Sequence, residues 1–262
     1  MAFIVLTSAA GSPGVTTTAV GLALTADRPA LLVEADPTGG SAVLAGFFRG
    51  TREHIGGLLE LVWAHRDGGL ADRLPRLTMS FPDSAASFVP GVQSHAQARS
   101  VAPIWDPLAG VLRDLRTTGQ DVVVDAGRLG LADPPEPLLH AADLIVLVVR
   151  SDLVAVSAAR SWAVSLRDRF DRIGAADRLG LLLVGPDRPY STREVSEVLG
   201  LPAAGSIAWS PGGAAVFSSG AQPPRRFQAS AYAQSLRTAW TAIRGKAATA
   251  DEFVAAGLEV RS

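Results

Sequence analysis

Residues 4–24, IVLTSAAGSPGVTTTAVGLAL, join an apolar run, a Gly/Ser/Pro turn and an Ala/Leu-rich stretch that opens with three threonines. This order predicts a buried strand that turns sharply into a helix. A phosphate-binding turn of this kind has the form G-x-x-x-x-G-K-[ST], and its lysine carries the positive charge that meets the phosphates. Val15 stands at the lysine position, and the only lysine of the chain is Lys246. The segment therefore predicts the backbone of a phosphate loop without its usual cation.

Short continuous apolar runs recur along the chain, which is typical of strands buried on both faces of a parallel sheet. We expect strands at residues 3–7, 30–34, 77–81, 121–125, 144–149, 179–184 and 206–208. We expect helices at residues 16–26, 55–66, 104–117, 154–170, 192–199 and 230–244. This alternation predicts an α/β protein with a single doubly wound, mainly parallel sheet flanked by helices.

Two Gly/Pro/Ser-rich stretches, residues 82–103 and 210–224, predict loops. The first lies where a binding or switch loop would be expected. Neither stretch separates two apolar cores, so we expect one domain over residues 1–250 and a C-terminal tail over residues 251–262.

Composition excludes several classes of function. The chain has no cysteine, which excludes disulfides, thiolate zinc sites and cysteine nucleophiles. Its four histidines lack metal-ligand spacing, and the net charge of −1 disfavours a strongly basic nucleic-acid binder. The N-terminus lacks the charged region of a signal peptide, and no apolar run approaches the roughly 20 residues that cross a bilayer. These features predict a cytoplasmic protein.

Polar residues follow three of the expected strands, at the sheet edge where open α/β proteins bind ligands. The first group is the loop, with Gly11, Ser12, Pro13, Gly14, Val15, Thr16 and Thr17. Its glycines permit a tight turn, and the amides that open the helix form an anion site. The Thr16 hydroxyl is placed to reach a magnesium ion, and Asp125 can hold the ion through water. Asp36 follows the second strand.

The loop, Asp36 and Asp125, in this order, resemble the MinD/ParA family of deviant-Walker-A ATPases, which belongs to the SIMIBI group of P-loop proteins. The family motif K-G-G-x-G-K-[ST]-T aligns with residues 10–17, where Ala10 and Val15 replace both lysines. The resemblance implies that ATP is the nucleotide and that Asp36 orients the attacking water. It also implies magnesium at Thr16 and Asp125, and a family lysine at position 10 that reaches across a dimer.

The late strand of the family ends in an asparagine that helps to read adenine, whereas this chain has LVGPDR at residues 183–188. Residues 192–202 and 214–220 are similar to the tail of the TadZ/CpaE-like branch, whose members localise pilus or secretion machinery. The resemblance thus implies a localisation, scaffold or regulatory factor for pilus, secretion or partition machinery. Such a factor would act through protein partners, as a homodimer or larger assembly, with weak or absent ATP hydrolysis.

Two alternatives remain open at this point. The first is an active ATP-dependent dimerisation switch, in which magnesium, backbone amides and Arg128 or Arg150 meet the phosphate charge. The second is a non-specific DNA-binding partition protein, which the slightly acidic balance disfavours. If the loop binds no phosphate, we expect Val15 to pack inward and the two aspartates to cap turns.

Overall fold

The computed structural model describes the backbone of residues 1–10 and 12–259 and the side chains of these residues up to 249. Gly11, a predicted loop residue, and residues 260–262 of the predicted tail lie outside the described residues. Within the described part, no helix combines the length and the apolar character needed to span a bilayer.

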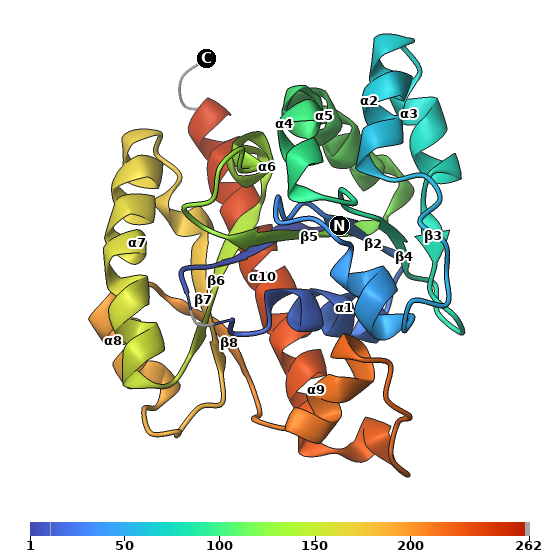
Figure 1. Cartoon of the computed structure of the whole chain (residues 1–262). Helices are drawn as coiled ribbons and strands as arrows, with labels where there is room; N and C mark the ends of the chain where they lie inside the picture. Colours follow the sequence, from blue (N-terminus) through green and yellow to red (C-terminus); the bar gives the residue numbers. More distant parts are fainter. Residues whose placement is uncertain (11, 260–262) are drawn as a thin grey trace.

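The described residues form one eight-stranded sheet in the order β3-β4-β2-β5-β1-β6-β7-β8. The strands are β1 (Phe3–Ser8), β2 (Ala30–Glu34), β3 (Met79–Ser80), β4 (Ser87–Val89), β5 (Asp121–Arg128), β6 (Leu144–Arg150), β7 (Leu179–Val184) and β8 (Ala203–Ile207). Only β3 runs antiparallel to its neighbour, and every other pair is parallel. The predicted doubly wound, mainly parallel sheet is confirmed (Figure 1).

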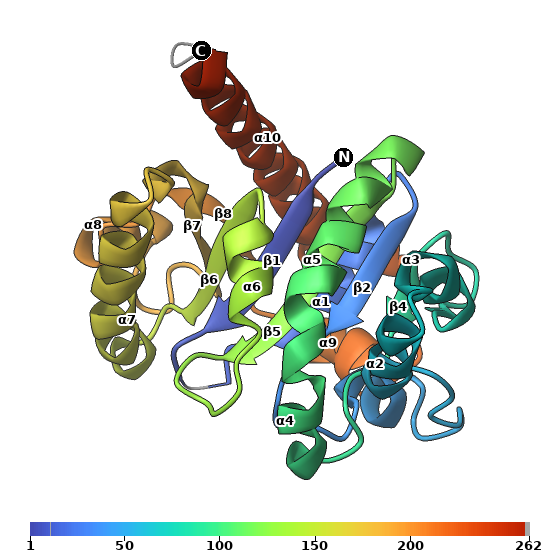
Figure 2. The same ribbon diagram turned by 90° about the horizontal axis from the view of Figure 1, so that it is seen from above.

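Helices cover both faces of this sheet (Figure 2). They are α1 (Val15–Thr25), α2 (Leu58–Arg66), α3 (Leu70–Arg73), α4 (Ala98–Val101), α5 (Trp105–Asp114), α6 (Glu136–Ala141), α7 (Leu153–Arg172), α8 (Thr192–Leu199), α9 (Pro211–Ser218) and α10 (Ala231–Glu259). Alternate residues of β1 enter opposite cores, because side chains alternate along a strand. Phe3 and Val5 pack with α2 and α5–α8, whereas Ile4 and Leu6 pack with α1, α9 and α10.

The sheet edge beyond β2 differs from the sequence prediction. Of the strand expected at residues 77–81, only the two residues of β3 form a strand, and they pair with β4 at the edge. On this side of the sheet, the parallel partner of β2 is β4, which lies inside the expected loop at residues 82–103. β4 has only three residues, and it lies between an Ala/Ser-rich segment and a Pro/Gly segment. The sequence therefore has no long apolar run that would predict this strand.

The expected loop at residues 210–224 contains helix α9. Its start carries a recognisable signal, since Ser210 accepts a hydrogen bond from the Gly213 amide at 3.1 Å and Pro211 occupies the first helical position. Two glycines in its first turn lower the helix propensity of this segment, so its composition indicates a loop.

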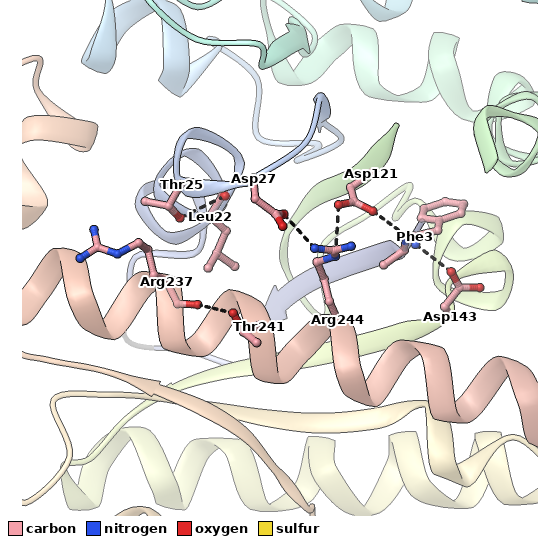
Figure 3. Close-up of polar contacts among 10 residues, drawn as sticks. Phe3, Leu22, Thr25, Asp27, Asp121, Asp143, Arg237, Thr241 and Arg244 are labelled. Carbon is pink, nitrogen blue, oxygen red and sulfur yellow. Dashed lines mark hydrogen bonds and ion pairs between the residues drawn. The ribbon is translucent and has the colours of Figure 1, made fainter. Parts of the chain in front are cut away.

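The amino ends of the strands are held by buried carboxylates, at the sheet edge opposite the predicted loop. Asp121 and Asp143 accept hydrogen bonds from the amides of Ala2 and Phe3, each at 2.8 Å. Arg244 of α10 reaches Asp121 at 3.3 Å, and it also reaches Asp27 at 2.8 Å (Figure 3). These contacts hold the amino end of β1 against α10, and they anchor the strand that leads into the loop.

Candidate functional site

The loop between β1 and α1 has the backbone of an anion site. Ser12 and Gly14 have positive φ angles of 44° and 89°, and the Gly14 carbonyl accepts a hydrogen bond from Thr18 N at 2.8 Å. No side chain caps α1, and the amides of residues 15–17 have no hydrogen-bond partner among the described residues. Free amides at a helix N-terminus attract anions such as phosphate.

Val15 fills the lysine position with an apolar side chain that faces the protein interior. It is 7% exposed and belongs to the core between the sheet and helices α1, α9 and α10. Inward packing of Val15 is the arrangement that we expect of a loop that binds no phosphate.

A cavity of about 260 Å³ lies over the loop. Its lining residues are Ser8, Ser12, Pro13, Gly14, Val15, Thr16, Thr17, Asp36, Gly127 and Arg128. The charged members of this lining are Asp36 and Arg128. Arg128 is exposed and has no ion-pair partner within the described part of the chain. Of the two arginines that sequence analysis considered, Arg128 therefore lines the loop cavity, and Arg150 does not.

Asp125 lies fully buried near the end of β5, directly behind Thr16. The Thr16 hydroxyl donates a short hydrogen bond to Asp125, and the Gly127 amide donates another at 3.0 Å. Burial, helped by the neighbouring carboxylates of Asp36 and Glu34, raises the pKa of Asp125 to about 7 against these two hydrogen bonds. The hydroxyl and carboxylate oxygens are hard donors that suit magnesium, and a bound cation would favour the ionised carboxylate.

Asp36 follows β2 and lies against the backbone of the next strand in the sheet. Its carboxylate accepts a hydrogen bond from the Thr38 amide at 2.8 Å. Gly127 has φ +63°, and a Cβ atom built there would lie 2.3 Å from the Asp36 carboxyl carbon. A side chain at position 127 would therefore displace Asp36. The structure thus brings Asp36, Thr16 and Asp125 together at the carboxyl ends of β2, β1 and β5, as the parallel sheet predicts.

Glu34 is a buried site residue whose role sequence analysis missed. Its carboxylate accepts hydrogen bonds from the Ser41 hydroxyl and from the amides of Val43 and Gly91, at 3.0 and 3.4 Å respectively. Burial raises its pKa against these contacts. Glu34 therefore ties the segment after Asp36 to the loop after β4. Glu34 and Gly91 lie 57 residues apart, so no local sequence pattern predicts the hydrogen bond between them.

A second cavity adjoins the loop cavity and extends along the ends of β6, β7 and β8, and the two cavities together form a trough. This cavity of about 200 Å³ is lined by Ser12, Pro13 and Gly14 at one end and by Arg150 and Trp209 at the other. Its lining has far more apolar than polar surface, which suits a planar ring. The site as a whole can hold an elongated ligand, with an anionic group on the loop amides and an apolar part near Trp209.

Solved structures with similar folds identify the architecture. This chain superposes on MinD complexed with Mg-ADP from Pyrococcus horikoshii OT3 with a TM-score of 0.68 and 17% identity, over 92% of this chain and 95% of that one. A ParA family ATPase from Chlorobium tepidum TLS gives 0.68 and 15%, over 92% and 99%. The chain has the fold of the MinD/ParA ATPases.

MinD in a MinC:MinD complex from Aquifex aeolicus matches equally well, with a TM-score of 0.68 and 16% identity over 92% of this chain and 95% of that chain. No protein-family model and no curated protein sequence matches the chain. The similarity to the TadZ/CpaE-like branch is not among these findings and stays a prediction.

Proposed function

We propose that this chain is a MinD/ParA-like protein with a lysine-less phosphate loop, which acts through protein partners with weak or absent ATP hydrolysis. It would serve as a localisation, scaffold or regulatory factor for pilus, secretion or partition machinery in the cytoplasm. The observation that carries the proposal is the burial of Val15, at 7% exposure, where the loop cation would stand. A cation that stabilises the transition state of phosphoryl transfer is worth roughly 10³–10⁵ in rate.

The remaining residues can bind a nucleotide weakly. The amides of residues 15–17 would hold a phosphate, and Thr16 and Asp125 would hold magnesium. Bound magnesium would supply positive charge beside the phosphates. Asp36 would orient a water molecule if hydrolysis occurred. Asp36 adds negative charge beside the site, and solvent screens the positive charge of the exposed Arg128, so the charge balance disfavours a triphosphate.

Exposed apolar side chains beside the trough support a role in partner binding. Leu153 and Val154 open helix α7, directly after β6, and are 64% and 77% exposed. Adjacent exposed apolar residues at a ligand-binding edge are typical of an interaction surface. The fold supports the same role, because a MinD with this fold has been solved in complex with MinC.

Light scattering with and without Mg-ATP tests the proposal. We expect the assembly state to be the same in both conditions, because the loop lacks the cation that would couple the nucleotide to assembly. The double variant Leu153→Ser/Val154→Ser should weaken self-association or partner binding. Val164→Ser, at a half-exposed position of the same helix, is its control. A dimer that forms only with Mg-ATP would contradict a scaffold role.

The alternative is an active ATP-dependent dimerisation switch. The free loop amides and the contact between Thr16 and Asp125 favour it, because both belong to a working phosphate site. Micromolar binding of Mg-ATP by calorimetry, with turnover that Asp36→Ala abolishes, would establish this alternative. Retention on DNA that falls steeply with salt would instead support a partition protein that binds DNA.

A further inference from the structure

A cavity distinct from the trough lies between the segment that follows β5 and helices α6 and α7. It has a volume of about 150 Å³. The two helices lie on the same face of the sheet, at the side where β6 and β7 lie (Figure 2). Arg128 is the one residue that lines both this cavity and the loop cavity. The site is therefore next to the phosphate loop but separate from its free amides.

The segment that forms one wall of this cavity, residues 127–130, is held on two sides. The Thr7 hydroxyl, which is buried in β1, donates a hydrogen bond to the Gly127 carbonyl at 3.1 Å. Gly130 has φ +83°, and a Cβ atom built there would lie 2.8 Å from a ring carbon of Trp162 on α7. The segment thus packs directly against the indole ring. The cavity is preformed in the folded chain, as ligand sites usually are.

The inner part of the cavity is apolar. Leu139 of α6 and Leu166 of α7 line it and are 4% and 3% exposed, and the half-buried ring of Trp162 forms a flat wall beside them. A cavity of this volume with such walls accommodates one six-membered ring. An indole wall favours an aromatic ring, because two rings attract each other in offset or edge-to-face contact. The interior therefore suits a single aromatic ring.

The charged residues of the lining are its more exposed members, and their balance is positive. Both carboxylate oxygens of Glu136 accept hydrogen bonds from Arg169 Nη1 at 2.7 Å, and His140 Nε2 lies 3.6 Å from one of them. The Arg169 guanidinium therefore balances the charge of Glu136. Arg128 is exposed and has no ion-pair partner within the described part of the chain. Because arginine donates paired hydrogen bonds to a carboxylate, the lining favours an anionic group over a cationic one.

We propose that this cavity binds a small aromatic carboxylate, a single ring of the size of benzoate. The ring lies against Trp162, and the carboxylate accepts hydrogen bonds from Arg128. Gly127 belongs to the same wall segment and packs closely on Asp36, so a bound ring contacts the backbone that positions Asp36. The inference goes beyond the proposed function and does not depend on nucleotide binding.

Titrations with benzoate, benzyl alcohol and benzylammonium test the chemistry of the ligand. The three probes share one ring and carry a negative, a neutral and a positive group. Calorimetry should show saturable binding, with benzoate about tenfold tighter than benzyl alcohol, as one charge-assisted contact at an exposed arginine allows. Benzylammonium should bind most weakly. Arg128→Ala should reduce benzoate to the affinity of benzyl alcohol. Arg160→Ala, at an exposed arginine of α7 outside the lining, is the matched control and should keep the preference.

Tryptophan fluorescence tests the location of the site. Benzoate should change the emission of the wild-type protein, and Trp162→Phe should remove this change. Trp209→Phe, at the tryptophan that lines the trough, should keep it.

Four outcomes would overturn the inference. They are no saturable binding of benzoate at millimolar concentration, equal affinity for benzoate and benzyl alcohol, a preference for benzoate that survives Arg128→Ala, and a fluorescence change that survives Trp162→Phe. All four would leave the scaffold role intact. Conversely, ATP turnover that depends on Asp36 would contradict the scaffold role and leave this site to be judged by the titrations.

Discussion

Replacing Val15 with alanine should destabilise the protein, although the residue lies where the loop meets the first turn of α1 and lines the loop cavity. The side chain is 7% exposed and packs in the core on the α1 side of the sheet. Val15→Ala removes two methyl groups, at about 0.8 kcal/mol each, and leaves a small cavity. We expect a loss of about 2 kcal/mol in the free energy of unfolding, which corresponds to about 4–8 °C in Tm.

Urea unfolding followed by circular dichroism measures this loss. Val164→Ala is the control, since Val164 lies in helix α7 and is 49% exposed, and it should change the free energy of unfolding by no more than about 0.5 kcal/mol. A loss at Val15 no larger than at Val164 would refute the reasoning, because Val15 would then not be a core residue.

Three further perturbations test the buried charges and the strand ends. Because burial raises the pKa of Asp125 from 3.8 to about 7, the folded protein binds more protons than the unfolded chain in this window, and its stability falls as pH rises through it. Asp125→Asn should flatten that fall when urea unfolding is compared at about pH 5 and pH 7.5. Gly127→Ala should cost at least about 1 kcal/mol in urea unfolding, since φ is +63° and the new Cβ meets a carboxylate; no loss would contradict this geometry. Arg244→Ala should cost about 3 kcal/mol by leaving buried Asp121 without its cation. Arg237→Ala, at a partly buried arginine of the same helix that bonds Gln228 instead of a carboxylate, should cost less, and equal losses would argue against the ion pair.

The core of the fold was predictable because its strands are continuous apolar runs. β1, β2, β6 and β7 lie where the sequence places them, and parallel strands necessarily bring their carboxyl ends to one edge. The convergence of Thr16 with Asp125, 109 residues away, follows from that topology. Two elements could not be predicted from the sequence. The three residues of β4 form a strand because they pair with β2, and α9 begins at a capping serine followed by glycines, which have low helix propensity.

The site was predictable in its backbone and less so in its electrostatics. The positive φ of Gly14 follows from the freedom of glycine, whereas the positive φ of Ser12 has no such signal in the sequence. The inward packing of Val15 follows from its apolar side chain. The buried Glu34 carboxylate accepts a hydrogen bond from the amide of Gly91, which lies 57 positions further along the chain. The Arg150 guanidinium lies over the ring of Trp209, 59 positions further along the chain. Such contacts arise only once the sheet is assembled, so no local sequence pattern encodes them.

The central claim is that the chain keeps the phosphate-loop fold while lacking the charge that drives hydrolysis. The turnover of saturating Mg-ATP by the wild-type protein, measured beside Asp36→Ala, tests it most directly. We predict that the two proteins release phosphate at the same rate, at or near the uncatalysed background. A wild-type rate well above background that falls to background in Asp36→Ala would contradict the claim.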